Sequence, residues 1–316
     1  MAQVCTWLPT LALVHYMLMQ VSSDKRTLNM YCHNILADAW VNLNADGGNT
    51  FYSGIPPALL DPRKRWDKAF RSALECAPDI ICFQEVGMAE VRALWCSQLA
   101  RSYILVGHVE NAETSAREPN GVLVLLRRGI VDPCYCHRSV QLAGTTGASL
   151  VRCRLQALPY EVLVVNCHLD WGELGCQQGL QLKDIIDEEC RERSLAVVWC
   201  GDFNACPDSP LMEALRTAGY HDAFEFRADW FSYCGPNSDL GRLDYMLYRG
   251  HIEIARHIVK PNGYLGKTPS GDAVCLNQTS LLGKFSDLTE LLARVGSDHA
   301  PLQAAFEAPI VRVSTV

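Results

Sequence analysis

The sequence has no Cys-x-x-Cys pair, although 15 of its 316 residues are cysteine. Without such pairs, a structural zinc site is not expected. The cysteine total is odd and the spacing does not match a disulfide scaffold, which favours a reducing compartment. Cys82, Cys167 and Cys200 lie instead within strongly apolar runs, and we interpret them as small buried core residues.

The sequence also lacks a glycine-rich phosphate loop. The glycines from Gly235 to Gly241 do not follow a strand and open a helix, which is the order that such loops require. This absence excludes both a Walker loop and a dinucleotide-binding fingerprint. It leaves open phosphate chemistry that depends on side chains and metal ions.

Basic residues are fewer than acidic ones. The 28 Lys and Arg residues and the 35 Asp and Glu residues give a formal net charge of −7, and the pI is about 5.7. Proteins that grip long nucleic acids rely on many Lys and Arg contacts to phosphates. We therefore expect no extended basic nucleic-acid surface, whereas a small local phosphate pocket is compatible with this charge.

Hydrophobic residues make up 49% of the sequence and charged residues 20%, which is the composition of a soluble globular protein. Its length suffices for one large domain or two small ones. No linker or repeat is found after the first two dozen residues. We predict one mixed α/β domain over residues 25–310, acting as a monomer.

The first 24 residues differ from the rest because the stretch from Trp7 to Val21 is apolar. The segment before it carries no Lys or Arg, and His15 interrupts the apolar run, so the match to a signal peptide is incomplete. Two interpretations stay open for residues 1–24: a hydrophobic extension, or a signal or anchor. The expected location is cytoplasmic, or secreted or membrane-associated if residues 1–23 act as a signal.

Apolar runs bounded by turn residues predict six strands. These are Thr27–Ile35, Ile80–Val86, Gly121–Leu126, Val162–His168, Ala196–Phe203 and Asp244–Tyr248. Helical periodicity predicts helices around Trp66, Leu94 and Ile185, and Ser209-Pro210 is typical of the start of a fourth. The stretch from Pro261 to Gly296 is rich in Gly, Ser, Thr and Asn and is interpreted as a long excursion.

Polar side chains gather where the apolar runs end. Strand ends are where sheet-containing enzymes commonly collect functional groups, and this set of carboxylates, amides and imidazoles is typical of a hard-cation site with acid–base helpers. The residues are Asn34, Glu85, His168, Asp202, Asn204, Asp244, Asp298 and His299. Taken singly, most have a structural interpretation, such as a turn former, a core histidine or half of an ion pair. The complete set is harder to explain in that way.

The order of these residues resembles that of the endonuclease–exonuclease–phosphatase superfamily over about residues 27–306. The matching motifs are Asn34, Gln84-Glu85, Asn166-Cys167-His168-Leu169, Gly201-Asp202-Phe203-Asn204, Leu243-Asp244-Tyr245 and Ser297-Asp298-His299. The resemblance implies an α/β (α+β) fold, namely the four-layered, DNase I-like β-sandwich of two mixed sheets flanked by helices. The nearest branch is that of the deadenylases and nocturnin. Where that branch commonly has Asp-Gly, this chain has Asn120-Gly121.

By this resemblance, a Mg²⁺ ion, with Mn²⁺ as a substitute, would be held by Asn34 and Glu85, and Asp298 would assist a second metal. His168 and Asn204 would donate hydrogen bonds to phosphate oxygens. The general base is left open between Asp202 and His299. Asp244 would orient the imidazole of His299.

Three residues are predicted to contact substrate: Asn120, which replaces the aspartate, and the aromatic residues Trp171 and Tyr233, with Phe231 as a further rim candidate. The predicted function is Mg²⁺-dependent phosphodiester hydrolysis on RNA or nucleotides, as in a 3′–5′ exoribonuclease. The alternatives are a sphingomyelinase-type or phosphoinositide-type lipid phosphoesterase acting on a lipid head group, an abasic-site endonuclease, and a catalytically inactive binding scaffold.

Overall fold

The computed structural model describes most of the chain from Thr27 to Glu307. The described residues are 27–41, 52, 54–111, 119–130, 135–144, 146–154, 160–191, 193, 195–225, 232–235, 240–254, 265–267, 273–275 and 288–307. The predicted extension at residues 1–24, the boundary at residue 310 and the rim candidate Phe231 lie outside them. Within the described ranges, no helix is both long and apolar enough to cross a membrane.

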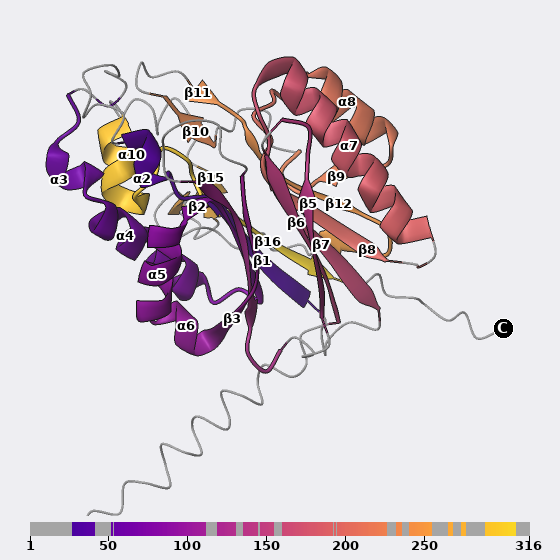
Figure 1. Ribbon diagram of the computed structural model, residues 1–316, viewed down its shortest axis with the longest axis horizontal. Coiled ribbons are helices and arrows are strands. Elements are labelled where there is room, and N and C mark those ends of the chain that lie inside the picture. Colours follow the sequence, from indigo (N-terminus) through magenta and orange to yellow (C-terminus); the bar gives the residue numbers. More distant parts are fainter. Residues whose placement is uncertain are drawn as a thin grey trace, which may run out of the picture.

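Two six-stranded sheets form the centre of the molecule (Figure 1). The first has the order β13 (Glu253–Ile254), β16 (Leu302–Glu307), β1 (Thr27–Asn34), β2 (Ile80–Gly87), β4 (Asn120–Arg127) and β3 (Tyr103–Glu110). The second has the order β5 (Cys136–Gln141), β6 (Gly147–Arg154), β7 (Glu161–His168), β8 (Ala196–Asp202), β12 (Asp244–Arg249) and β9 (His221–Asp222). Both sheets are mixed, because β1 with β2 and β7 with β8 are parallel while the other pairs are antiparallel.

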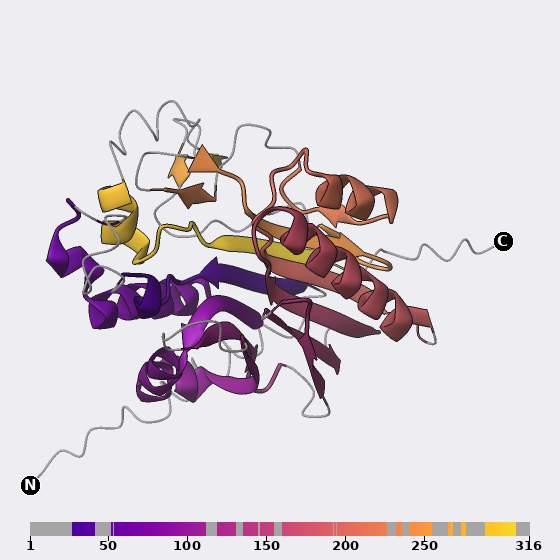
Figure 2. The same ribbon diagram turned by 45° about the horizontal axis from the view of Figure 1, so that its top comes forward.

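Helices cover the outer face of each sheet (Figures 1 and 2). The first sheet packs against α4 (Pro62–Cys76) and α5 (Met88–Cys96), and the second against α7 (Gly172–Arg191) and α8 (Pro210–Thr217). Shorter elements are α2 (Asp38–Val41), α3 (Pro57–Leu60), α6 (Leu99–Ser102), α10 (Leu288–Val295) and the hairpins β10 (Tyr233–Cys234) with β11 (Leu240–Gly241) and β14 (Leu265–Lys267) with β15 (Ala273–Cys275). The four-layered fold predicted from the sequence is confirmed.

The apolar runs follow from burial on both faces of the strands. Along β8, Val198 and Cys200 contribute to the core between the sheets, whereas Val197 and Trp199 contribute to the core beneath α7 and α8. Because a strand covered by layers on both sides buries every side chain, its sequence is a continuous apolar run. The same layering leaves the predicted core cysteine Cys82 fully buried.

Two buried amides join the sheets across the sandwich. Gln84 Nε2 on β2 donates to Asn166 Oδ1 on β7 at 2.6 Å. Asn166 Nδ2 in turn donates to the carbonyl oxygens of Phe83 and Leu123, each at 3.0 Å, in the first sheet. Both amide side chains are fully buried, so these bonds satisfy polar groups that would otherwise destabilise the core.

Local signals fix where the helices begin. At α4, the Asp61 side chain accepts hydrogen bonds from the backbone amides of Arg63 and Lys64, with Pro62 in the first turn. At α8, the predicted N-cap Ser209 accepts a hydrogen bond from the Met212 amide at 3.4 Å. These are the expected partners for otherwise unsatisfied amides at a helix start.

The predicted excursion from Pro261 to Gly296 is wrong in part. Leu288–Val295 forms α10, and the short hairpin of β14 and β15 precedes it. Within α10, Leu288 and Leu292 pack into a small apolar cluster with Leu36 and Tyr52. The helical pattern is only eight residues long and follows a polar segment. The polar composition of the whole stretch therefore did not indicate this helix.

Candidate active site

Strands from both sheets deliver polar side chains to one end of the sandwich. Asn34 ends β1, Glu85 lies near the end of β2, and Asp202 ends β8. The antiparallel strand β12 begins with Asp244 directly opposite Asp202. His299 lies just before β16, which pairs with β1. The chain therefore brings residues far apart in sequence to a single edge.

A single amide links the carboxylates of the two sheets. Asn34 Nδ2 donates to Glu85 Oε1 at 2.9 Å and to Asp202 Oδ2 at 3.0 Å. The second oxygen of Glu85 accepts from the Ala37 amide at 2.8 Å, and Asn34 Oδ1 accepts from the Leu36 amide at 3.1 Å. In this arrangement Asn34 orients both carboxylates, and a cation ligand role for it requires the amide to turn its oxygen inward.

Two site residues adopt backbone conformations that are unfavourable for non-glycine residues. Glu85 has φ of 58° and Asn204 has φ of 46°. Glu85 lies at a β-bulge, where the register of β2 against β4 shifts between Gln84 and Val86. Bulges re-aim side chains, and such strain persists where surrounding contacts enforce it, commonly at functional sites.

The second sheet contributes a compact group around Asp202. Asp202 Oδ1 accepts from the Asn204 amide at 2.9 Å, and Asn204 Nδ2 donates to the Leu169 carbonyl at 2.8 Å. The imidazole Nε2 of His168 lies 3.3 Å from Asn204 Nδ2 and 3.6 Å from Asp202 Oδ2. His168 and Asn204 are thus adjacent, as their predicted shared role requires.

His299 and Asp244 form a buried pair beside Asp202. His299 Nδ1 lies 2.8 Å from Asp244 Oδ2, and its Nε2 lies 3.6 Å from Asp202 Oδ2. Burial alone would lower the pKa of His299, but the carboxylates of Asp244 and Asp202 outweigh it and raise that pKa well above its usual value. Burial, followed by repulsion from Asp244, raises the pKa of Asp202.

Asp298 is held by a tyrosine hydroxyl group and lies near a serine hydroxyl group. Tyr52 OH donates to Asp298 Oδ2 at 3.0 Å, and Ser297 Oγ lies 3.4 Å from Asp298 Oδ1. Ser297 Oγ also donates to the Asn34 carbonyl at 2.7 Å. Burial, opposed by His299 and reinforced by Glu85, raises the pKa of Asp298. Tyr52 was not singled out from the sequence, since no local pattern marks it.

Of the three predicted substrate contacts, Tyr233 touches a site residue directly. The Tyr233 ring stacks at an angle on the His299 imidazole, with ring centroids 4.9 Å apart. Trp171 follows the end of β7 and is 61% exposed. Asn120 begins β4 opposite Gly87 and is buried. No described hydrogen bond joins Asn120 or Trp171 to the site carboxylates.

The site fits a divalent cation. Four carboxylates are nearly inaccessible to solvent: Glu85 at 7%, Asp202 at 1%, Asp244 at 1% and Asp298 at 3% exposure. Among the described residues, their ion pairs involve only histidines, and Asp244 Oδ1 has no hydrogen-bond partner. Ligand atoms of Asp202, Asp244 and His299 lie within 4.8 Å of one another. Such a buried excess of oxygen ligands and negative charge suits a hard cation.

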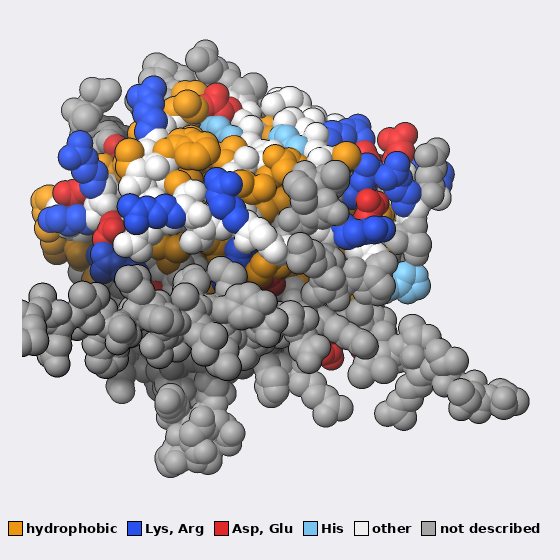
Figure 3. Space-filling view, turned by 90° about the horizontal axis from the view of Figure 1, so that it is seen from below, with side chains coloured by type: hydrophobic (Ala, Val, Ile, Leu, Met, Phe, Trp, Pro, Cys, Tyr) orange, Lys and Arg blue, Asp and Glu red, His pale blue; other side chains and the backbone are white. Residues whose placement is uncertain are grey.

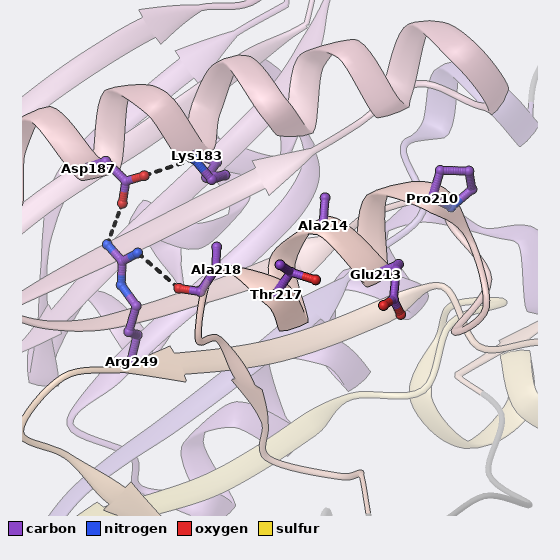
Figure 4. Close-up of a pocket in the computed structure, with 8 residues that line it drawn as sticks. All are labelled: Lys183, Asp187, Pro210, Glu213, Ala214, Thr217, Ala218 and Arg249. Carbon is purple, nitrogen blue, oxygen red and sulfur yellow. Dashed lines mark hydrogen bonds and ion pairs between the residues drawn. The ribbon is translucent and has the colours of Figure 1, made fainter.

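A separate hollow of about 720 Å³ lies between α7 and α8 and the end of β12. Its two cations are bound to one carboxylate, since Lys183 Nζ and Arg249 Nη2 lie 2.9 Å and 2.6 Å from Asp187 oxygens (Figure 4). Arg249 and Asp244 occupy opposite ends of β12, about 17 Å apart for a strand of this length. None of the predicted site residues lines this hollow.

Comparisons with known proteins identify the family of the chain and relatives of its fold. A sequence profile described as the Endonuclease/Exonuclease/phosphatase family matches residues 39–299. Protein angel homolog 2 from Danio rerio is 27% identical over 187 residues, which are 53% of this chain and 32% of that protein. The chain thus spans about a third of the length of this curated relative, whose match accords with the predicted branch.

Solved structures share the fold. The human Nocturnin catalytic domain with bound sulfate is 16% identical with a TM-score of 0.63, covering 90% of this chain and 95% of that one. ANGEL2, a 2′,3′-cyclic phosphatase, is 13% identical with a TM-score of 0.63, covering 89% and 95%. D. rerio TDP2 complexed with a single-strand DNA product is 14% identical with a TM-score of 0.55, covering 89% and 99%.

The profile extends over most of the chain, and its span includes each of the motif residues from Glu85 to His299. These residues lie at or beside strand ends in a sandwich that these solved structures share. The chain belongs to the Endonuclease/Exonuclease/phosphatase family.

Proposed function

We propose that this protein is a magnesium-dependent phosphodiesterase that hydrolyses phosphodiester bonds of RNA or of nucleotides. The observation that carries the proposal is the convergence of Glu85 and Asp202 on Asn34, with the pair of His299 and Asp244 beside Asp202. Support for a nucleotide substrate comes from relatives: TDP2 was captured with a single-strand DNA product, and ANGEL2 with adenosine-2′,3′-vanadate.

Glu85, with Asn34 and Asp298, would hold the metal. A bound Mg²⁺ would neutralise charge on phosphate oxygens and supply coordinated water molecules. Asp202 lies 3.6 Å from the imidazole nitrogens of both His168 and His299. This central position favours Asp202 as the group that orients and deprotonates the attacking water.

The remaining polar groups stabilise charge on the phosphate. His168 and Asn204 would donate to its nonbridging oxygens, and each such preorganised donor is worth about 3 kcal/mol in a transition state. Asp244 fixes the His299 ring through Nδ1, so that Nε2 faces the centre of the site. His299 would then donate a hydrogen bond to the phosphate.

Mg²⁺-dependent turnover tests the proposal. The purified protein should hydrolyse bis-p-nitrophenyl phosphate and a single-stranded oligo(A), whereas sphingomyelin should be left intact. Glu85→Gln and Asp202→Asn should each lower kcat by about 100-fold or more, because they remove groups used in the transition state. Glu213→Gln, an exposed carboxylate on α8, is the matched control and should behave as wild type.

Metal binding gives a second readout that does not depend on turnover. Glu85→Gln should weaken Mn²⁺ binding, measured by titration calorimetry, by at least about 10-fold. Normal turnover by Glu85→Gln or Asp202→Asn would show that the roles are wrongly assigned. Cleavage of sphingomyelin in preference to oligo(A) would replace the nucleotide substrate with a lipid.

A second candidate substrate is RNA ending in a 2′,3′-cyclic phosphate. It is favoured by the sequence match to angel homolog 2 and by the likeness to ANGEL2, which is named a 2′,3′-cyclic phosphatase. Adenosine 2′,3′-cyclic phosphate, offered beside oligo(A), distinguishes the two. Faster opening of the cyclic ester would make it the preferred substrate.

A further inference from the structure

Arg65 is a cation in the interior of the protein. On the face seen in Figure 3, Lys and Arg side chains lie at the surface beside hydrophobic ones. The side chain of Arg65 on α4 is instead fully buried, and burial lowers the pKa of its guanidinium. Charged side chains are almost never fully buried unless they are paired. An apolar side chain of similar length would avoid the cost of removing this charge from water, so packing alone does not account for Arg65.

The guanidinium of Arg65 binds backbone carbonyls more closely than it binds a carboxylate. Its Nη2 lies 3.6 Å from Asp38 Oδ1 and makes no hydrogen bond within the described part of the chain. Its Nη1 donates to the carbonyl oxygens of Leu36 at 2.6 Å, Ile35 at 3.4 Å and Gly296 at 3.5 Å. A planar, rigid guanidinium is suited to fixing several acceptors at once. The contacts of Arg65 therefore indicate a group that holds backbone in place.

The shortest of these bonds reaches a strained turn beside the site. Leu36 has φ of 57°, which is unfavourable for any residue except glycine. In this turn the Leu36 amide donates to Asn34 Oδ1 at 3.1 Å, and the Ala37 amide donates to Glu85 Oε2 at 2.8 Å. The turn thus orients two of the side chains that are proposed to hold the metal. Such strain persists only where surrounding contacts enforce it, and the bond from Arg65 is one of those contacts.

The carbonyl of Gly296 belongs to the second loop that carries a proposed metal ligand. It is followed by Ser297, whose Oγ donates to the Asn34 carbonyl at 2.7 Å, and then by Asp298. The backbone here packs directly on α4, since a Cβ added to Gly296 would lie 2.4 Å from the Arg65 carbonyl oxygen. The positive charge of Arg65 also attracts the Asp298 carboxylate. Arg65 therefore joins the loop after Asn34 to the loop before Asp298.

We propose that Arg65 is a positioning residue that holds Asn34, Glu85 and Asp298 in the arrangement that the metal requires before the metal binds. This inference rests on the proposed function, because it concerns the same cation. Buried carboxylates repel one another until a cation arrives, so loops that are held in place reduce the reorganisation that binding would otherwise require. Arg65 acts through backbone carbonyls, and its loss should therefore weaken metal binding while leaving substrate binding unchanged.

Arg65→Lys and Arg65→Met test the proposal. Lysine keeps the charge but lacks the fork that reaches three carbonyls, whereas methionine keeps the apolar stem alone. Mn²⁺ affinity, measured by titration calorimetry on the full chain, should fall about 10-fold for Arg65→Lys and up to about 100-fold for Arg65→Met. At saturating Mn²⁺, KM for bis-p-nitrophenyl phosphate should stay within about twofold of wild type. Thermal melting reports folding, and Arg65→Lys carries the test if Arg65→Met does not fold.

Arg249→Met is the matched control for a general loss of stability. Arg249 is also partly buried and donates to a carboxylate and a carbonyl, those of Asp187 at 2.6 Å and Ala218 at 3.4 Å, but it lies in the hollow away from the site. Arg249→Met should lower the melting temperature and leave Mn²⁺ affinity within about twofold of wild type. Equal weakening of Mn²⁺ binding by Arg249→Met and Arg65→Lys would overturn the inference, because it would mark a structural effect only.

The calorimetric measurement also separates this inference from the proposed function. If Mn²⁺ binds, and the Arg65 substitutions weaken its binding, but no phosphodiester is hydrolysed, then the phosphodiesterase proposal fails while the role of Arg65 stands. If bis-p-nitrophenyl phosphate is hydrolysed but Arg65→Lys binds Mn²⁺ as tightly as wild type does, then the role of Arg65 fails while the hydrolase stands. Absence of Mn²⁺ binding by the wild-type protein would overturn both.

Discussion

Asp244 contributes to the site through His299, whose Nδ1 it holds at 2.8 Å. Asp244→Asn keeps the volume of the side chain but removes the negative charge behind the imidazole. We expect kcat on bis-p-nitrophenyl phosphate to fall by about 100-fold, because the ring loses its fixed orientation and its proton affinity. Because the Asp244 carboxylate raises the pKa of His299, its loss should also move the basic limb of the pH–rate profile to lower pH, where the imidazole loses the proton that it donates.

The matched control is Asp184→Asn on α7, which alters a carboxylate whose side chain is 79% exposed. Its kinetics should equal those of wild type. If Asp244→Asn retained full activity with an unchanged pH profile, the pair would be structural, and His299 would need another source of orientation.

His33 makes stability depend on pH. Its ring is fully buried, with Nε2 3.1 Å from the His299 carbonyl, and burial lowers the pKa of His33 to about 3. Below pH 6.5, His33 is therefore protonated in the unfolded chain but stays neutral in the folded protein. The free energy of unfolding consequently falls as pH falls. Between pH 7 and pH 5 this loss is about 2 kcal/mol.

Urea denaturation of His33→Gln at pH 7 and pH 5 measures this effect. The variant should lose about 2 kcal/mol less than wild type over that interval, whatever its stability at pH 7. His221→Gln, at an exposed position, should follow wild type. Identical pH dependence in all three proteins would mean that His33 is protonated in the folded state.

The side chains of the candidate site were predictable from sequence because they end apolar runs. Glu85 and Asp202 each follow a continuous buried strand, and a carboxylate in that place needs a partner or a metal. Tyr52 and Arg65 were not predictable in this way. Tyr52 meets Asp298 from 246 positions away, and Arg65 Nη1 reaches the Leu36 carbonyl at 2.6 Å from inside α4. Such partners arise from tertiary packing alone.

The close packing of β7 against β8, two strands that carry site residues, requires a glycine at position 201. Gly201 precedes Asp202 and has φ of +142°, and a Cβ added to it would lie 1.9 Å from the Cys167 carbonyl oxygen of the parallel strand β7. Gly201→Ala should therefore separate β7 from β8 and lower the free energy of unfolding by about 3 kcal/mol or more. Activity should fall with it, because both strands end in site residues.

Gly219→Ala is the control that introduces backbone strain without a steric clash. Gly219 has φ of +82°, but the space around its Cβ position is open. Its cost should stay near 1–2 kcal/mol, the ordinary penalty for a left-handed residue. Urea denaturation of both variants gives the comparison. If Gly201→Ala cost no more than Gly219→Ala, the close contact with β7 would not constrain the strand.

Burial favoured the prediction of a strand but was not sufficient, since β6 and β16 also lie inside the sheets, are largely buried and were not predicted. The six predicted strands lie inside the sheets, whereas β5 was missed because most of its residues are at least partly exposed and its sequence shows no apolar run. The bulge at Glu85 was not foreseen either. A one-residue shift in pairing against β4 leaves no trace in the hydrophobic pattern of β2.

The four-layered architecture as a whole was predictable through the order of the motifs and not through periodicity. Periodicity located strands and helices, but it could not pair β1 with β16 across almost the full length of the chain. The resemblance carried by the motif order implied the sandwich, but the pairing of β1 with β16 became visible only in the structure. How the two sheets are joined face to face became visible only in the structure.

The buried side-chain amides of Gln84 and Asn166 form a hydrogen bond between the two sheets. Asn166→Leu removes donors to two carbonyls and the acceptor of Gln84, so we expect a loss of about 3 kcal/mol in unfolding free energy. Gln84→Leu should cost less, because Asn166 keeps both carbonyl partners. In the double variant both partners are apolar, so the loss should fall short of the sum by about 1 kcal/mol or more.

Urea denaturation of the four proteins in this cycle measures the coupling directly. Asn166→Leu combined with Gln303→Leu is the control pair, because Gln303 lies on β16 opposite Tyr31 and shares no described hydrogen bond with Asn166. That pair should be additive within about 0.5 kcal/mol. Additivity of Gln84→Leu and Asn166→Leu to the same precision would show that the bond between these two amides does not help to hold the sheets together. The edge that carries Glu85 and Asp202 would then owe its alignment to the core beneath it rather than to this bond.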